Sequence, residues 1–378
     1  MTQLATLASV ILFAVAGVIA VTIAAIHAGR VLTERRRARR VARPRQLLFA
    51  FVASGDPAEL TELARMPAAD WRAVAPSAFE LLTKVRGEAH EALATLLARR
   101  GLVHQARREL HSISAVRRAR SAAALGSLHD GASVPQLCRL LADTHPEVRV
   151  AAIQALGRIG DPAAARPLLS SLQPPQPAPS QLVAHALAQL GPRIAPMLLP
   201  ALTGPPLVQT TVLDAMRLIG TFEGEGGLAG RVPAQVAEVL QDDRSQPVRL
   251  RAAKTLGRLG SGAAMAPLLA STQPAEPAPL RAAAAAALGE LGAVDAVTPL
   301  AELLTCGDDH VAGAAATALS RLGPTGLAAL NRAAATQATA TGPARRGAEH
   351  ANAVLDRIAR SAAAREPAPA PKREALRS

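Results

Sequence analysis

Residues Val148 to Gly160 read Val-Arg-Val-Ala-Ala-Ile-Gln-Ala-Leu-Gly-Arg-Ile-Gly. Close copies occupy Val248–Gly260 and Leu280–Gly292, and more divergent copies occupy residues 116–128, 181–191, 208–220 and 311–323. An apolar residue near the end of each unit serves as an anchor, and the anchors recur at intervals of 32, 31, 31, 29, 40, 32 and 31 residues. The anchors are Leu93, Leu125, Leu156, Leu187, Met216, Leu256, Leu288 and Leu319. A period in this range predicts a solenoid, a propeller or another array of repeats.

Each repeat is predicted to be a pair of short helices. Alanine and leucine recur at three- and four-residue spacing, as in an amphipathic helix, and the glycine after the last apolar position, such as Gly160, suits a left-handed helix end. A second apolar segment between anchors usually opens with proline, which the first turn of a helix tolerates. These prolines are Pro135, Pro167, Pro267 and Pro299. Because stacked hairpins bury a core that one hairpin cannot, we expect an all-α fold, an α-solenoid of stacked helical hairpins.

The pattern Val-Arg-x-x-Ala-Ala-x-Ala-Leu-Gly resembles the second helix of HEAT repeats, in particular the short bacterial HEAT-like, phycobilin-lyase-type repeat. The resemblance covers Val85 to Leu330 and implies that the second helices line the concave face. It also implies that the arginine that stands seven residues before five of the anchors braces adjacent repeats through an acidic residue near the hairpin turn. The arginines are Arg86, Arg118, Arg149, Arg249 and Arg281, and the candidate acidic residues are Asp143, Asp243 and Asp309.

The sequence also contains a longer duplication, which includes several of these repeats. A shift of 100 residues aligns Pro167-Leu168-Leu169 with Pro267-Leu268-Leu269, and Gln173-Pro174 with Gln273-Pro274. This alignment predicts a duplicated block of three repeats, with two proline-rich loops on the same edge of the solenoid.

The composition argues against several classes of function. Tyrosine is absent and aromatic residues make up 2% of the chain, which leaves little material for stacking bases or sugars. Cys138 and Cys306 form no Cys-x-x-Cys pair, so neither a zinc site nor a disulfide framework is indicated. Of the net charge of +13, residues 30–45 carry +7 and residues 357–378 carry +4, which leaves +2 for the rest. A DNA-binding solenoid needs basic residues along its groove, so nucleic-acid binding is disfavoured.

The N-terminal residues predict a single-pass transmembrane helix. Leu4 to Ala25 is an uncharged apolar run of 22 residues, and a helix of this length spans roughly 33 Å, enough for the ~30 Å core of a bilayer. Arginines follow the run, whereas a cleaved signal peptide carries its charge before the run. The positive-inside rule then places the solenoid in the cytoplasm and the short N-terminus outside. The arginines at the membrane interface are Arg30, Arg35, Arg36, Arg37, Arg39, Arg40, Arg43 and Arg45.

These features predict a linear organisation of the chain. Residues 1–29 form the anchor, 30–45 the basic juxtamembrane segment, 46–358 the solenoid and 359–378 a disordered tail. Within the solenoid we expect a divergent N-terminal cap at 46–84, clear repeats at 85–330 and a C-terminal cap at 331–358. Ser54 and Asp56-Pro57 indicate a helix start, and residues 221–231 form a Gly-rich insertion. The composition, rich in Ala, Arg and Pro, and the HEAT-like subtype of the repeat indicate a bacterial protein. The predicted anchor then places it in the inner (plasma) membrane.

The sequence contains no constellation of residues typical of catalysis, and it predicts neither a cofactor nor a metal. The leading hypothesis is a membrane-anchored, non-catalytic scaffold that binds a protein partner, itself membrane-associated, through the solenoid surface. The alternative is a HEAT-like lyase, or another enzyme or accessory protein acting on a bound small molecule or nucleic acid, and self-association is a third hypothesis. Polar residues two positions from an anchor are expected to face the partner. They are Gln154, Arg158, His185, Gln189, Asp214, Lys254, Arg258, Glu290 and Arg321.

Overall fold

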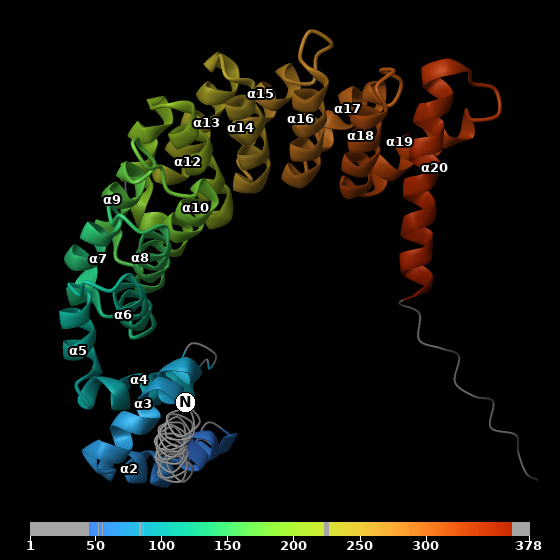
Figure 1. Ribbon diagram of the computed structural model, residues 1–378. Helices are drawn as coiled ribbons and strands as arrows, with labels where there is room; N and C mark the ends of the chain where they lie inside the picture. Colours follow the sequence, from blue (N-terminus) through green and yellow to red (C-terminus); the bar gives the residue numbers. More distant parts are fainter. Residues whose placement is uncertain are drawn as a thin grey trace, which may run out of the picture. The chain divides into compact units, whose positions relative to one another are not determined.

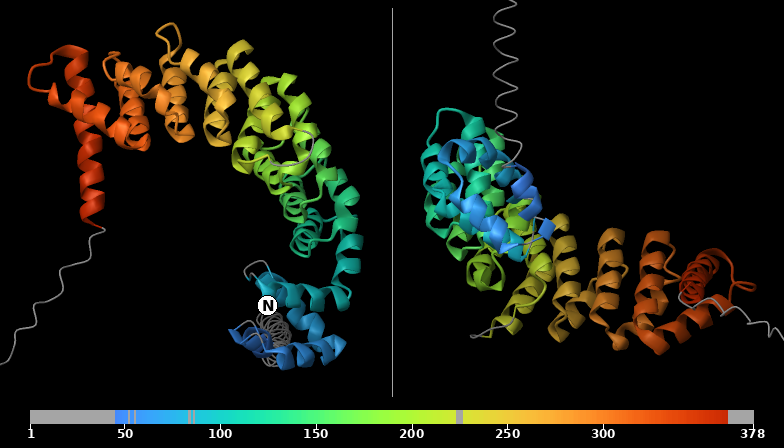
Figure 2. Two further views of the ribbon diagram at one scale, coloured as in Figure 1. Left: turned by 180° about the vertical axis from the view of Figure 1, so that it is seen from behind. Right: turned by 90° about the horizontal axis from the view of Figure 1, so that it is seen from below.

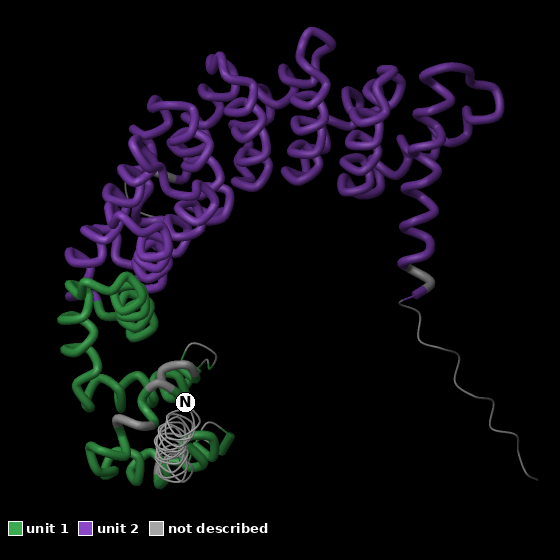
Figure 3. Tube along the Cα trace, in the orientation of Figure 1, with its two compact units in different colours: residues 1–130 green, residues 131–378 purple. Residues whose placement is uncertain are grey.

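The computed structural model describes residues 45–364, apart from residues 52, 55, 83–84, 86 and 223–226. Every element of regular secondary structure in this part of the chain is a helix. The chain divides into two compact units, residues 1–130 and residues 131–378 (Figure 3). The predicted anchor at 4–25, the arginines from Arg30 to Arg43 and the tail beyond residue 364 lie outside the described residues.

The first unit contains a helical core around the single tryptophan of the chain, Trp71. Residues 45–51 are helical, and α2 (Pro57–Arg65), α3 (Ala68–Leu82), α4 (Glu88–Arg99), α5 (Leu102–Glu109) and α6 (Ala115–Ser127) follow. Leu48 and Leu63 pack with Trp71 in one buried cluster. The Arg100 guanidinium lies 4.9 Å from the centroid of the Trp71 ring, and Nη2 of Arg100 donates to the carbonyl oxygens of Leu63 and Met66, both at 2.7 Å.

The start of α2 confirms a local prediction. Asp56 is the N-cap, and its carboxylate accepts a hydrogen bond of 2.8 Å from the backbone N–H of Ala58. Pro57 opens the helix and Glu59 lies in its first turn. An aspartate at this position stabilises the helix because it satisfies a backbone donor that has no partner within the helix.

The second unit is a stack of helical hairpins (Figures 1 and 2). The second helices of successive hairpins pack side by side, from α8 through α10, α12, α14, α16 and α18 to α20. Most of the first helices are shorter or broken, although α13 is as long as the second helices. Several first helices open with a single 3-10 turn, such as η2 (Pro162–Ala164), η5 (Gly262–Ala264) and η6 (Val294–Ala296). The elements are α7 (Val134–Leu140), α8 (Pro146–Ile159), α9 (Ala165–Ser170), α10 (Ser180–Gln189), α11 (Ala195–Leu198) with η4 (Leu199–Thr203), α12 (Pro206–Ile219), α13 (Leu228–Asp242), α14 (Gln246–Leu259), α15 (Met265–Ala270), α16 (Ala278–Leu291), α17 (Val297–Leu303), α18 (Asp309–Arg321), α19 (Gly323–Ala335) and α20 (Gly342–Ala363).

The repeat explains the core of this stack. The six anchors of this unit, from Leu156 to Leu319, have no exposed surface, and the same is true of Leu93 and Leu125 in the first unit. The helices α8, α14 and α16 each end at a glycine in the left-handed conformation, at Gly160, Gly260 and Gly292, as the sequence predicts. Glycine occupies these positions because a side chain disfavours a positive φ.

A second set of glycines has a role that the sequence analysis does not foresee. Gly157, Gly257 and Gly289 directly follow an anchor, where the second helices touch. A Cβ atom on Gly257 would lie 2.7 Å from the Cα atom of Ala287, and one on Gly289 would lie 2.6 Å from the Cα atom of Ala318. These glycines therefore allow neighbouring second helices to approach backbone to backbone.

Two predicted boundaries need correction. The helix α20 continues to Ala363, so residues 359–363 are helical and not part of a disordered tail. The helix α13 begins at Leu228, so residues 228–231 of the predicted Gly-rich insertion are also helical. In both places the helical stretch lacks the clean repeat pattern on which the prediction rested.

Among the described residues, no single helix is long and apolar enough to cross a membrane. One pair of segments, Ser180–Gln189 and Pro192–Thr203, passes the same test of length and composition together, but it is bent by 108°.

Candidate partner-binding face

The side of the second unit formed by its second helices is called here the second-helix face, and it carries all the predicted partner-binding residues. Gln154 and Arg158 lie on α8, His185 and Gln189 on α10, Asp214 on α12, Lys254 and Arg258 on α14, Glu290 on α16 and Arg321 on α18. Eight of these nine side chains are exposed, and Asp214 is half-buried. The rule that placed them, two positions from an anchor, therefore selects accessible residues. Their role in binding remains a prediction.

Ion pairs between adjacent helices neutralise part of this face. The Asp214 carboxylate on α12 pairs with Arg251 on α14, and it lies 3.9 Å from Nε of Arg217 in its own helix. Glu290 on α16 lies 3.5 Å from Nη1 of Arg321 on α18. Asp214, Glu290 and Arg321 are among the predicted partner-binding residues, whereas Arg217 and Arg251, which contact Asp214, are not.

Three cations on the face remain available. Arg158, Lys254 and Arg258 are exposed, and within the described part of the chain none of them makes a hydrogen bond or an ion pair. Lys254 and Arg258 lie one turn apart on α14, so they point to the same side of that helix. A partner carboxylate could bind here without breaking a contact inside the chain.

A shallow groove of about 340 Å³ lies between α16 and α18 on the same face. Its floor is lined by small residues, including Ala286, Gly313, Ala314 and Thr317. Glu290 and Arg321 lie at one end, and Asp309 and His310 lie near the start of α18. Thr317 stands two positions before an anchor, so the rule that selected Lys254 could also have found it. The arrangement suits a side chain or a short backbone segment with polar groups at both ends.

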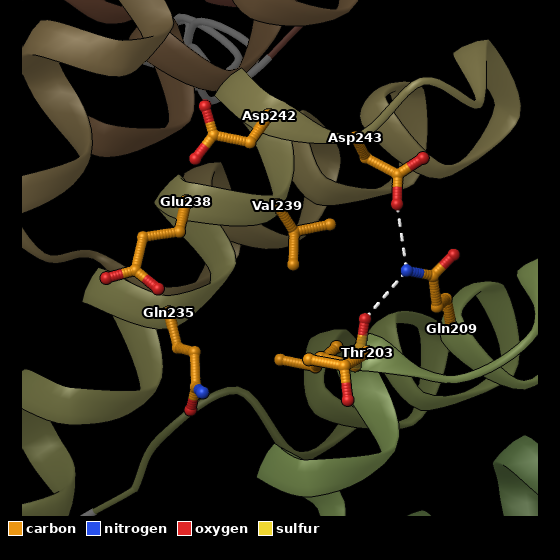
Figure 4. Close-up of a pocket in the computed structure, with 8 residues that line it drawn as sticks. Thr203, Gln209, Gln235, Glu238, Val239, Asp242 and Asp243 are labelled. Atoms are coloured by element: carbon orange, nitrogen blue, oxygen red, sulfur yellow. Dashed lines mark hydrogen bonds between the residues drawn. The ribbon is translucent and has the colours of Figure 1, made fainter.

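A second pocket, of about 260 Å³, lies beside α13 (Figure 4). Glu238 and Asp242 at its rim are exposed carboxylates. Gln209 on α12 is buried and donates from Nε2 to the carbonyl oxygen of Leu202 at 2.7 Å and to Oδ2 of Asp243 at 2.8 Å. The amide therefore ties α12 to the end of α13, which is a structural role. The sequence gives no signal for this pocket, because it depends on how three elements pack.

Arg249 and Arg149, two of the predicted bracing arginines, contact groups other than the predicted side-chain carboxylates. Nη2 and Nη1 of Arg249 donate to the two carboxylate oxygens of Glu276, at 2.6 and 2.9 Å, while Asp243 instead accepts from Gln209. Nη1 of Arg149 donates to the backbone oxygen of Asp143 and to Oε1 of Gln176, both at 2.9 Å.

The two contacts are related by the 100-residue duplication, because Gln176 and Glu276 occupy equivalent places in the two proline-rich loops. Asp309 pairs with α20, where Nε of Arg346 lies 3.5 Å from its carboxylate. Arg281 donates from Nε to the backbone oxygen of Thr272 at 3.2 Å. Arg86 lies outside the described residues. For Arg149, Arg249 and Arg281, the bracing role is therefore supplied by the loop of the next repeat and by turn carbonyls.

We expect Arg249→Ala to lower the free energy of unfolding by about 2 kcal/mol, because it removes charge-assisted hydrogen bonds and leaves Glu276 half-buried without its cation. Chemical denaturation followed by circular dichroism measures the change. The matched control is Arg139→Ala, on the exposed surface of α7, which should change stability by less than about 0.5 kcal/mol. A double-mutant cycle with Glu276→Ala that shows no coupling would contradict the bracing role.

These observations define the class of the protein, an α-solenoid of stacked helical hairpins. The repeats are HEAT repeats, because the family model of that description matches residues 105–188 and 233–320. The chain therefore contains HEAT repeats, as the pattern around Leu156 predicts. No curated protein matches the chain.

Solved structures with similarity to this chain include proteins of different functions. The E. coli protein YibA is 18% identical with a TM-score of 0.37, and the match covers 70% of this chain and 95% of YibA. The CpcE–CpcF complex of phycocyanin lyase from Nostoc is 21% identical with a TM-score of 0.31, covering 67% of this chain and 94% of that chain. Kap121p is 14% identical with a TM-score of 0.45, and the match covers 86% of this chain and 42% of that chain.

Proposed function

We propose that this protein is a non-catalytic scaffold that binds a protein partner through the second-helix face. The observation that carries the proposal is the set of exposed cations on that face, Arg158, Lys254 and Arg258, which have no partner within the described part of the chain. They lie among residues of both charge signs that are already paired. A solenoid presents such a face as an extended surface, and extended surfaces are the usual binding surfaces of repeat proteins.

The chemistry of the face favours a protein over a nucleic acid. Acidic residues, such as Asp214 and Glu290, lie between the cations along the row of helices. A phosphate backbone would be repelled by these carboxylates, whereas a protein surface can offer both signs of charge in a matching order. The partner that fits is therefore a folded or extended protein segment with carboxylates opposite Arg158 and Arg258.

We further propose that the scaffold works at the bacterial inner membrane. The apolar run at residues 4–25 is the proposed anchor, and the arginines that follow it place the repeats in the cytoplasm by the positive-inside rule. The described part of the chain begins at the last of these arginines, Arg45, whose guanidinium carbon lies 5.6 Å from the centroid of the Phe49 ring. A membrane-associated partner is the kind that such a scaffold would meet.

The test is affinity capture of the full-length chain from gently solubilised membranes. The variant Arg158→Glu/Arg258→Glu reverses two cations that have no intramolecular partner, so it should lose the partner while keeping its helical circular dichroism. The matched control is Arg139→Glu/Arg166→Glu, which makes the same charge change on α7 and α9 and should capture as the wild type does.

Equal capture by all three proteins would show that another surface binds the partner. A full-length preparation that retains a coloured small molecule or DNA, and captures no protein, would favour the lyase or nucleic-acid alternative. Membrane association is read separately, from the fraction of the chain that sediments with membranes before solubilisation.

A further inference from the structure

A short turn joins α5 to α6 (Figure 1). This turn and the first turn of α6 carry the two most exposed large hydrophobic side chains of the described residues. Ile113 is fully exposed, at 101%, and Val116 is 64% exposed. Single exposed hydrophobic residues are ordinary on protein surfaces, but these two lie three positions apart at one turn. Together they form an apolar tip that nothing in the first unit covers within the described part of the chain.

Backbone contacts hold this tip in place. Nη1 of Arg118 donates to the carbonyl oxygens of Ser112 and Ile113, at 2.8 and 3.0 Å. The backbone N–H of Ser114 donates to Oγ of Ser112 at 3.3 Å. The exposure of Ile113 is therefore a property of a turn that is tied to α6.

Cations surround the tip. Residues 107–120 contain five arginines and one glutamate. Arg107 forms an ion pair with Asp130, in which Nη2 of Arg107 lies 2.6 Å from Oδ1 of Asp130. The hydrogen bond to Asp130 raises the pKa of Arg107. Three further arginines, Arg108, Arg117 and Arg120, are exposed, and their side chains make no hydrogen bond or ion pair among the described residues.

The positions of these arginines place them beside the apolar tip. Arg120 lies four residues after Val116, so both side chains lie on the same face of α6. Arg108 lies in the last turn of α5, and Arg117 directly follows Val116. Glu109 is bound by Oγ of Ser121 at 3.1 Å and by Nε2 of Gln105 at 2.8 Å, so the cations dominate around the tip.

We propose that this tip, formed by Ile113 and Val116 with Arg108, Arg117 and Arg120, inserts into the surface of an anionic phospholipid bilayer. The inference rests on the proposed membrane anchorage. A protruding apolar tip enters a fluid bilayer surface, while arginines around it contact anionic head groups. A protein partner would instead need a preformed pocket for the protrusion, with acidic residues around it.

The proposed anchor permits this contact. Residues 26–44 separate the apolar run from Arg45, and 19 residues of extended chain span at most ~65 Å. The described part of the first unit can therefore turn its α5–α6 edge to the bilayer. The repeats would then be held against the membrane at a second point, which limits the orientations in which the second-helix face is presented.

The test uses the full chain in lipid nanodiscs, with an environment-sensitive dye attached at Ile113→Cys in a Cys138→Ala/Cys306→Ala background. One set of nanodiscs contains phosphatidylcholine, and the other contains an equal mixture of phosphatidylcholine and phosphatidylglycerol. Spin-labelled lipid should quench the dye strongly in the anionic nanodiscs and weakly in the neutral ones. The same dye at Val294→Cys, an exposed position on η6, is the control and should not be quenched in either set.

The variant Arg108→Gln/Arg117→Gln/Arg120→Gln tests the cations separately. Each arginine near an anionic surface strengthens lipid association about fivefold, so the variant should lose the dependence on phosphatidylglycerol while its circular dichroism is unchanged. A dye at position 113 that is not quenched in chains that have entered the nanodiscs would overturn the inference. A dye whose emission indicates an apolar environment, but which spin-labelled lipid does not quench, would show that protein covers position 113. That result would also overturn the inference. Chains that do not enter nanodiscs at all would instead refute the proposed anchor.

Discussion

Replacing Gly289 with valine should lower the free energy of unfolding by about 3 kcal/mol. The Cβ atom of the new side chain would lie 2.6 Å from the Cα atom of Ala318 and 2.7 Å from its Cβ atom. Backbone atoms cannot rotate away as the end of a flexible side chain can, so α16 and α18 would have to separate. Urea denaturation followed by circular dichroism measures the effect.

The control for this change is Gly262→Val. Gly262 lies in η5, and a Cβ atom there meets no atom within 4 Å. That variant should unfold within about 0.5 kcal/mol of the wild type. Equal losses at the two glycines would show that the cost arises from glycine replacement in general and would contradict the close approach of α16 and α18.

The effect should also be localised. Trp71 lies in the first unit and is buried, so its fluorescence reports on that unit. Because each repeat of a solenoid contacts only its neighbours, Gly289→Val should shift the circular dichroism transition more than the transition in Trp71 fluorescence. A shift of equal size in both would mean that the two units unfold as one.

Replacing Leu256 with alanine should lower the free energy of unfolding by about 3–4 kcal/mol. Leu256 has no exposed surface, and it lies in α14 between the second helices α12 and α16. Truncation removes buried apolar surface and leaves a cavity, because the stacked helices on both sides can close it only in part. Thermal and urea unfolding of the full chain both measure the loss.

The same substitution at Leu207 is the matched control. Leu207 lies in the neighbouring helix α12 but is 43% exposed, so Leu207→Ala should cost less than about 1 kcal/mol. Similar losses at Leu256 and Leu207 would mean that the repeat pattern does not distinguish core from surface. That result would undermine the assignment of the anchors and, with it, the second-helix face.

The position of Gly257 and Gly289 in the repeat also explains why α12 differs from its neighbours. Arg217 stands at the place in α12 that glycine occupies in α14 and α16, directly after the anchor. Its guanidinium lies near Asp214, which also pairs with Arg251 of α14. A charged cluster therefore replaces the close backbone contact at this point of the second-helix face.

Much of the architecture follows from the repeat alone. The spacing near 31 residues predicts stacked hairpins, and the Leu156 pattern identifies the second helix of each. Positions such as Lys254 and Arg258 are correctly expected to be exposed, because a helix that buries its anchor turns the residues two positions away toward solvent. The end of α20 is predicted less well, because its last turns do not follow the repeat.

The partners of charged residues are predicted poorly. The bracing role of Arg249 can be inferred from its register, but its bond to Glu276 cannot, since 27 residues and a proline-rich loop separate the two. Likewise, the pairing of Asp214 with Arg251 depends on how α12 and α14 are offset along their axes. The exposure of Ile113 is also not predicted, because the sequence pattern does not distinguish an exposed isoleucine near a helix start from a buried one.

The sequence by itself determined the fold class, the helical hairpin, the buried anchors and the left-handed glycine ends, because these depend on periodicity and backbone conformation within one repeat. Only the tertiary structure decided which charges pair across helices, where Gly289 meets Ala318, and that Ile113 stands free in solvent. These features depend on the distance and offset between elements from different repeats, and a periodic pattern carries no information about either.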